Sequence, residues 1–346
     1  MIGGLGRYFF GHNFTGALIS TTMIAIAQLW VLPAPAILTE IWFIPQERPV
    51  AISIAFFCNI LGLSFFQLVA CYMVKQQQDL NDFLLFQGIF MAVPFILSIL
   101  FIKNKPKHSV TQITEESHVK LGTIEGIKKC YFHFHTLISI FCLSMYLGLT
   151  WTFDSVIEMI LGESYSQLQL GYVNLAMNSA GTVGGLLSSF YIEKQLNNKQ
   201  IPKYDFFIKV FSTISFLLLI VFTIENYFDK EGKNKFLVYL ILTLIGLGFN
   251  GFVPIGMQSL LETVFPVSET VAFTVFNQVA NIIGLLGNFV AKEGVWLICV
   301  LLLPLYLYIM VKYKTDLKKL NQEKRLQRQS VHNISQRKQS NKYQEP

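Results

Sequence analysis

The side chains best suited to bind a small solute lie within one apolar segment, residues 134–160. Trp151, Asp154 and Glu158 are three and four residues apart, so they share one face of a helix. An aromatic ring beside two carboxylates can attract a quaternary ammonium or an amine. Counting the helical rise from His135 also places Asp154 near the outer end of a membrane-spanning helix. Two interpretations therefore stay open, a solute site and a pair of acids that marks the membrane interface.

Amide side chains recur on other apolar segments. They are Asn59, Asn174, Asn178, Asn250, Gln258, Asn277 and Asn281. Hydrogen bonds between helices account for most such amides in a membrane protein. Asn277 and Asn281 share a helix face and, like Asn59, are equally compatible with solute binding.

A short link between two apolar segments, residues 262–269, has a carboxylate at each end. Pro266 cannot continue the first helix, so the chain must turn there. Ser268 is suited to cap the second helix, and Glu269 lies where a helix dipole favours an anion. Glu262 and Glu269 are therefore predicted to lie at neighbouring helix ends.

The composition predicts an all-α, multi-pass membrane protein. The 346 residues are 53% hydrophobic and 14% charged, against about 25% charged residues in soluble domains. Nine segments are long and apolar enough to be candidate membrane helices. They are residues 14–41, 50–74, 83–102, 134–160, 168–192, 206–225, 236–261, 269–290 and 295–312. The five cysteines are scattered, and no residue set is expected to hold a metal or a cofactor.

The basic residues predict an orientation and a domain division. Residues 103–133 are rich in lysine, the loop at 161–167 has no basic residue, and ten lysines and arginines lie between residue 312 and the end. Basic loops stay in the cytosol, so the C-terminus should be cytosolic and near anionic lipid, not bound to nucleic acid. We expect a three-helix part at 1–102, a linker at 103–133, a six-helix bundle at 134–312 and a basic disordered tail at 313–346.

Three stretches resemble the FLVCR (feline leukaemia virus subgroup C receptor-related) haem/choline transporter family of the major facilitator superfamily. The first is Gln28–Gly62, with Trp42-Phe43, Glu47-Arg48 and Asn59-Ile-Leu-Gly62. The second is Ala180-Gly-Thr-Val-Gly-Gly-Leu-Leu187 with Glu193 after it. The third has Gly251, Pro254, Glu262, Pro266 and Glu269 in the spacing of the family's tenth and eleventh helices.

The resemblance implies a major-facilitator fold in which the nine segments correspond to helices four to twelve, with the first three absent. It implies alternating-access transport of choline, ethanolamine or haem, with aromatic groups of the seventh helix in the solute pocket. It also implies that Glu47, Arg48, Glu193, Glu262 and Glu269 gate the cytosolic mouth. Ile60 and Asn281 stand where the family has glutamines, which changes the expected solute contacts.

The alternative to transport is a truncated, transport-incompetent membrane protein that acts as a receptor or partner. An enzyme is not expected, because the sequence contains neither a Gly-x-Gly-Asp nor a His-Glu-x-x-His motif. The expected partners are the lipid bilayer, of the plasma membrane, and a small-molecule substrate. The sequence does not indicate an oligomeric state.

Overall fold

The computed structural model describes residues 2–31, 33–44, 46–76, 78–101, 121–161, 164–228, 234–291, 294–322 and 325. Every regular element within these ranges is a helix, which confirms the predicted all-α class. In chain order the helices are α1 (Ile2–Phe10), α2 (Phe14–Val31), α3 (Ala34–Trp42), α4 (Arg48–Met73), α5 (Asp79–Phe101), α6 (Thr123–Phe132), α7 (Phe134–Leu161), α8 (Gln167–Asn197), α9 (Tyr204–Phe228), α10 (Lys235–Val264), α11 (Glu269–Ala291) and α12 (Val295–Val311).

Eight of the nine expected segments each correspond to one helix. The first, 14–41, is broken into α2 and α3 near Pro33, because proline lacks the amide that an unbroken helix needs. In the described ranges, six helices, α4, α5, α7, α9, α10 and α11, are long and apolar enough to cross a membrane. The apolar stretches of α2 and α12 are shorter, and α8 carries many glycine, serine and asparagine residues.

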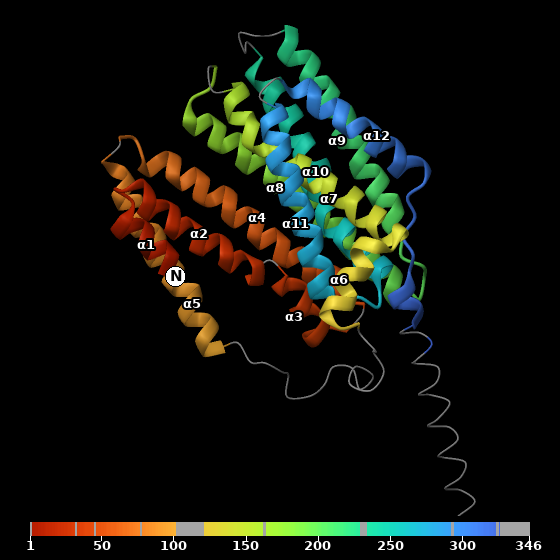
Figure 1. The fold of residues 1–346 in the computed structure, drawn as a ribbon. Helices are drawn as coiled ribbons and strands as arrows, with labels where there is room; N and C mark the ends of the chain where they lie inside the picture. The colour runs from red at the N-terminus through yellow and green to blue at the C-terminus, as the bar shows by residue number, and fades with distance from the viewer. Residues whose placement is uncertain are drawn as a thin grey trace, which may run out of the picture.

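Helices α7–α12 form one bundle with α10 near its centre, packed against α7, α8 and α9 (Figure 1). Aromatic rings fill its core, where Phe153 lies 5.9 Å from Phe222 and 5.7 Å from Phe249, between ring centroids. Small residues bring α8 and α10 close together. A Cβ added to Gly181 would lie 2.2 Å from the carbonyl oxygen of Gly246, so neither backbone could approach as closely with a larger residue.

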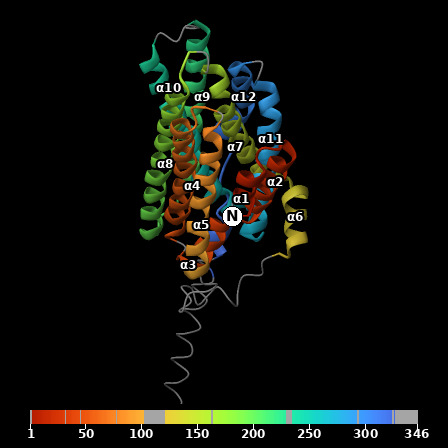
Figure 2. The ribbon, with the colours of Figure 1, turned by 90° about the vertical axis from the view of Figure 1, so that its left-hand side faces the viewer.

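The helices before the linker meet this bundle along two neighbouring lines of contact (Figures 1 and 2). Helix α4 packs against α8, and α2 and α3 lie beside α11. Helices α1 and α5 complete an outer layer with α2. We call these two lines the α4–α8 seam and the α2–α11 seam. The end of the molecule that holds the turn between α10 and α11 is called the turn end.

The chain after α12 differs from the predicted disordered tail. Residues 313–322, here called the C-terminal strap, cross the turn end and pack against α9 and α10. The backbone amide of Thr315 donates to Asp205 Oδ1 at 2.7 Å, and Tyr313 is buried. The expectation was wrong for this part because Tyr313 and Leu317 supply apolar anchors. Residues 326–346, and residues 103–120 of the predicted linker, lie outside the described residues, so the domain division stays a prediction.

Candidate functional site

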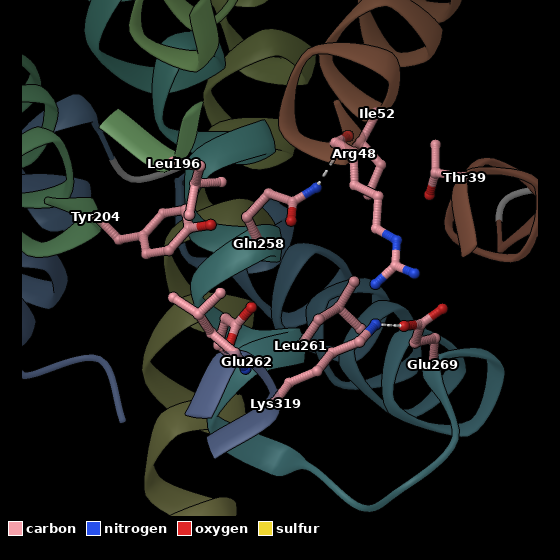
Figure 3. Close-up of a pocket in the computed structure, with 11 residues that line it drawn as sticks. Thr39, Arg48, Ile52, Leu196, Tyr204, Gln258, Leu261, Glu262, Glu269 and Lys319 are labelled. Carbon is pink, nitrogen blue, oxygen red and sulfur yellow. Dashed lines mark hydrogen bonds and ion pairs between the residues drawn. The ribbon is translucent and has the colours of Figure 1, made fainter. Parts of the chain in front are cut away.

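Charged and polar side chains from four elements meet at the turn end (Figure 3). This turn-end cluster consists of Arg48 from α4, Gln258 and Glu262 from α10, Glu269 from α11 and Lys319 from the strap. Lys319 and Glu269 form a buried ion pair, and the Arg48 guanidinium points toward that pair. The cavity among them is about 20 Å³, room for about one water molecule. The space inside the turn-end cluster is therefore too small for an organic solute.

The strap holds this closed arrangement with both backbone and side chains. The Leu320 amide donates to Glu262 Oε2 at 2.9 Å, and Lys318 Nζ donates to the Thr263 carbonyl at 3.2 Å. The Tyr313 hydroxyl lies 2.7 Å from Ser259 Oγ, and burial raises the pKa of this phenol. The strap is thus fixed to α10 at several points beside the ion pair.

Three of the five predicted gating residues meet in this cluster. Arg48, Glu262 and Glu269 line one cavity, and Gln258 Nε2 donates to the Arg48 carbonyl at 3.4 Å. Glu47 is exposed just before α4, and Glu193 is half-buried on α8. Neither of these two lines the cavity. The structure therefore brings part of the predicted set together.

A second cavity lies in the α2–α11 seam. Its volume is about 210 Å³, and its polar lining comes from Gln28, Thr274, Asn277, Gln278 and Asn281. Asn281 Nδ2 donates to the Asn277 carbonyl at 2.9 Å. The Asn277 Nδ2 atom is buried and has no hydrogen-bond partner among the described residues. Unused amide groups beside a cavity can bind a polar solute.

The predicted aromatic and acidic group on α7 lies further along α11. A Cβ on Gly284, three residues after Asn281, would lie 3.8 Å from Trp151 Cε3. Asp154 Oδ1 is buried and has no hydrogen-bond partner in the described part of the chain. Glu158 is exposed and accepts a hydrogen bond from Gln67 Nε2 of α4 at 2.8 Å. The three residues share a face of α7 as predicted, but they do not line the α2–α11 cavity.

The remaining predicted amides have different surroundings. Asn59 is exposed on α4 and does not line the cavity. Asn178 lies in the α4–α8 seam, where its Nδ2 donates to Ser64 Oγ at 2.8 Å and its Oδ1 accepts from Asn250 Nδ2 at 2.6 Å. Asn178 and Asn250 are therefore structural hydrogen-bonding partners.

Sequence reasoning missed Lys319 and the cavity residues Gln28 and Gln278. Lys319 was assigned to a disordered tail because lysines dominate that region. Leu317 and Leu320, three residues apart beside it, were a usable indication of a packed helical turn. Gln28 precedes the break between α2 and α3, and no spacing pattern in the sequence links it to α11.

Comparisons with known proteins agree with this architecture. The family profile of the Major Facilitator Superfamily matches residues 1–288. Choline/ethanolamine transporter FLVCR1 of Felis catus is 22% identical over 90% of this chain and 58% of its own length. Choline/ethanolamine transporter FLVCR2 of Rattus norvegicus is 20% identical over 82% of this chain and 52% of its own length. Solute carrier family 49 member A3 of Xenopus tropicalis is 25% identical over 75% of this chain and 51% of its own length.

The chain thus spans between about half and three-fifths of the length of these curated relatives. The profile and the relatives confirm the resemblance to the FLVCR family that the three sequence stretches indicated.

Proposed function

Because the chain belongs to the major facilitator superfamily, we propose that it moves a small organic solute across a membrane by alternating access. The observation that carries this proposal is the pair of cavities. An amide-lined space of about 210 Å³ lies in the α2–α11 seam, while the space inside the turn-end cluster measures only about 20 Å³. A solute held in the seam would reach the turn-end side only if the turn-end cluster opened.

We propose a choline- or ethanolamine-like amine as the solute. The names of FLVCR1 and FLVCR2 record this substrate class for those proteins. In this chain the cavity is below the range of about 300–1,000 Å³ typical of drug-sized ligands, which favours a small amine over a haem. Trp151, Asp154 and Glu158 would attract a cation on its way along α11, by cation–π and charge interactions.

Each amide and charge has a proposed role. Asn277 and Asn281 would hydrogen-bond the solute hydroxyl or ammonium from α11, with Asn59 facing them from α4 in another state. Arg48, Glu262 and Glu269 would gate the turn end by breaking and remaking the cluster. Glu47 and Glu193 lie outside the closed cluster, so their part in gating would require movement of α4 and α8.

We further propose that the turn end faces the cytosol, in the plasma membrane. The lysines of 103–133 and of the segment after α12 support this orientation, because basic residues concentrate on the cytosolic side. Protease digestion of intact cells should spare the C-terminus, and digestion of permeabilised cells should remove it.

Transport is tested by uptake of radiolabelled choline into proteoliposomes that contain the full chain. We expect uptake above empty liposomes, reduced about tenfold by Asp154→Asn, because Asn keeps the shape and removes the charge that attracts the cation. Ser155→Ala, at the neighbouring exposed position, is the matched control and should leave uptake unchanged. Absence of uptake by the unmodified chain would contradict the proposal, and equal uptake by Asp154→Asn would contradict the role of Asp154.

A further inference from the structure

A larger groove, of about 750 Å³, lies at the turn end outside the turn-end cluster. Its lining residues come from the end of α6, the turn between α10 and α11, the C-terminal strap and Arg325. Figure 1 shows where α6 lies. Lys129 and His133 line one side, and Lys318 and Arg325 line the other. Among the described lining residues Asp316 supplies the sole carboxylate. The groove is therefore positively charged.

The positive charges in the groove are only partly balanced. Asp316 pairs with Lys318 at 3.2 Å, whereas Lys129 and Arg325 form no ion pair within the described part of the chain. Burial, and then the nearby charge of Lys318, lower the pKa of Lys129. An anion between the two sides would relieve this repulsion. The amides of Asn321 and Gln322 also line the groove and add donors for an anion with several oxygens.

Helix α6 gives the groove an apolar flank. It buries Gly126 and Cys130, and a Cβ on Gly126 would lie 3.3 Å from Val267 Cγ1 in the α10–α11 turn and 3.5 Å from Val271 Cγ1 of α11. Ile124 and Phe132 are left on the outside, 71% and 85% exposed, although both are strongly apolar. Because spanning helices α7 and α11 lie directly beside α6, this exposed apolar surface fits lipid chains better than water.

We propose that this groove binds the phosphate monoester headgroup of a membrane lipid, with the acyl chains against the exposed apolar surface of α6. Lys129, Lys318 and Arg325 would contact the phosphate oxygens, as basic side chains do at anionic membrane surfaces. A headgroup bound to both Lys129 and Lys318 would also fasten the strap to α6. The site is separate from the proposed solute path, so its test does not depend on transport.

The test uses the purified full chain in detergent, titrated with dioctanoyl phosphatidic acid and followed by native mass spectrometry. Two control ligands separate the parts of the lipid: inorganic phosphate carries the anion alone, and dioctanoylglycerol carries the acyl chains alone. We expect phosphatidic acid to bind at least tenfold more tightly than either. Each basic contact is worth about fivefold, so Lys129→Gln with Arg325→Gln should weaken binding about 30-fold.

The matched control removes the same number of charges from exposed lysines elsewhere at the turn end, Lys194→Gln with Lys203→Gln, and should change affinity less than twofold. Arg325→Gln alone, at an exposed position, should weaken binding about fivefold. An equal loss in the control pair would overturn the proposal, because binding would then follow net charge alone. Phosphate that binds as tightly as the lipid would overturn the assignment to a lipid.

Discussion

The α4–α8 and α2–α11 seams use the same polar residue types in opposite ways. In the α4–α8 seam the polar groups contact one another, with Ser53 and Ser189 joined at 2.5 Å and Asn178 bonded to both Ser64 and Asn250. In the α2–α11 seam Asn277, like its cavity neighbours, lines open space. The difference teaches that an amide in a membrane helix serves as a packing contact where it pairs across a seam, and is available to bind a solute where it lines open space.

Packing between the helices decides which outcome occurs. In the α4–α8 seam Gly171 lies against Leu68 and Cys71, so the backbones approach closely and short side chains reach across. In the α2–α11 seam the chain breaks near Pro33, and Pro33 itself lines a cavity of about 210 Å³. The paired amides thus accompany close helix packing, and the amides that line a cavity accompany the helix break.

The largest effect should come from the turn end, where α4 and α11 are brought together with the strap. Lys319→Ala removes the buried ammonium that pairs with Glu269, which should reduce the free energy of unfolding by about 3 kcal/mol. Reversible unfolding in mixed micelles measures this change. The pair is buried, so added salt should alter the result little.

Asp316→Ala is the control for Lys319→Ala, because it breaks an ion pair in the same strap that is partly exposed to solvent. Exposed pairs contribute about 0–1 kcal/mol, so this variant should stay close to the unmodified chain. The double variant Lys319→Ala with Glu269→Ala should recover part of the loss. If Lys319→Ala and Asp316→Ala lowered the free energy of unfolding equally, the Lys319–Glu269 ion pair would not stabilise the turn end as a buried pair should.

A smaller effect should come from filling the tightly packed seam. Gly171→Leu places a branched side chain where even a Cβ would lie 3.1 Å from Leu68 Cδ1, so α4 must move away from α8. Overpacking of this kind should cost about 2 kcal/mol in the free energy of unfolding. Gly62→Leu is the same change on α4, at a position where an added Cβ meets nothing within 4 Å. If both variants lost the same free energy of unfolding, the α4–α8 seam would be no more tightly packed at Gly171 than the open position at Gly62.

The sequence was sufficient for most of the helices and for part of the site. Long apolar runs predict helices without tertiary information, and eight of the nine expected segments were each found as one helix. Glu262 and Glu269 were predicted to lie at neighbouring helix ends because Pro266 forces a turn between them. Those predictions depend on local chain geometry alone.

Other features depend on contacts that local patterns do not encode. Lys319 has the same surroundings in sequence as other tail lysines, and only the folded strap places it against Glu269, 50 residues away. Asn178 and Asn277 are both amides on apolar helices, and the presence or absence of a partner across a seam separates them. Whether an amide pairs across a seam or lines a cavity therefore depends on tertiary contacts.

The smallest and most discriminating test exchanges one amide in each seam for leucine. Asn178→Leu removes two hydrogen bonds, so the free energy of unfolding should fall by about 1 kcal/mol, the scale of such bonds in membranes. Asn277→Leu replaces an amide whose Nδ2 has no partner among the described residues, so stability should be unchanged or slightly higher.

Choline uptake should show the reverse order. Asn277→Leu makes the wall of the cavity apolar and should lower uptake about tenfold, whereas Asn178→Leu should lower it less than threefold, because its side chain lies outside the cavity lining. Both variants add the same side chain to a buried site on a membrane helix, so a general effect of leucine would appear in both measurements equally. If instead Asn277→Leu lost stability and kept its uptake, the α2–α11 seam would be a packing contact like the α4–α8 seam, and the solute path would have to be sought along α7, beside Asp154.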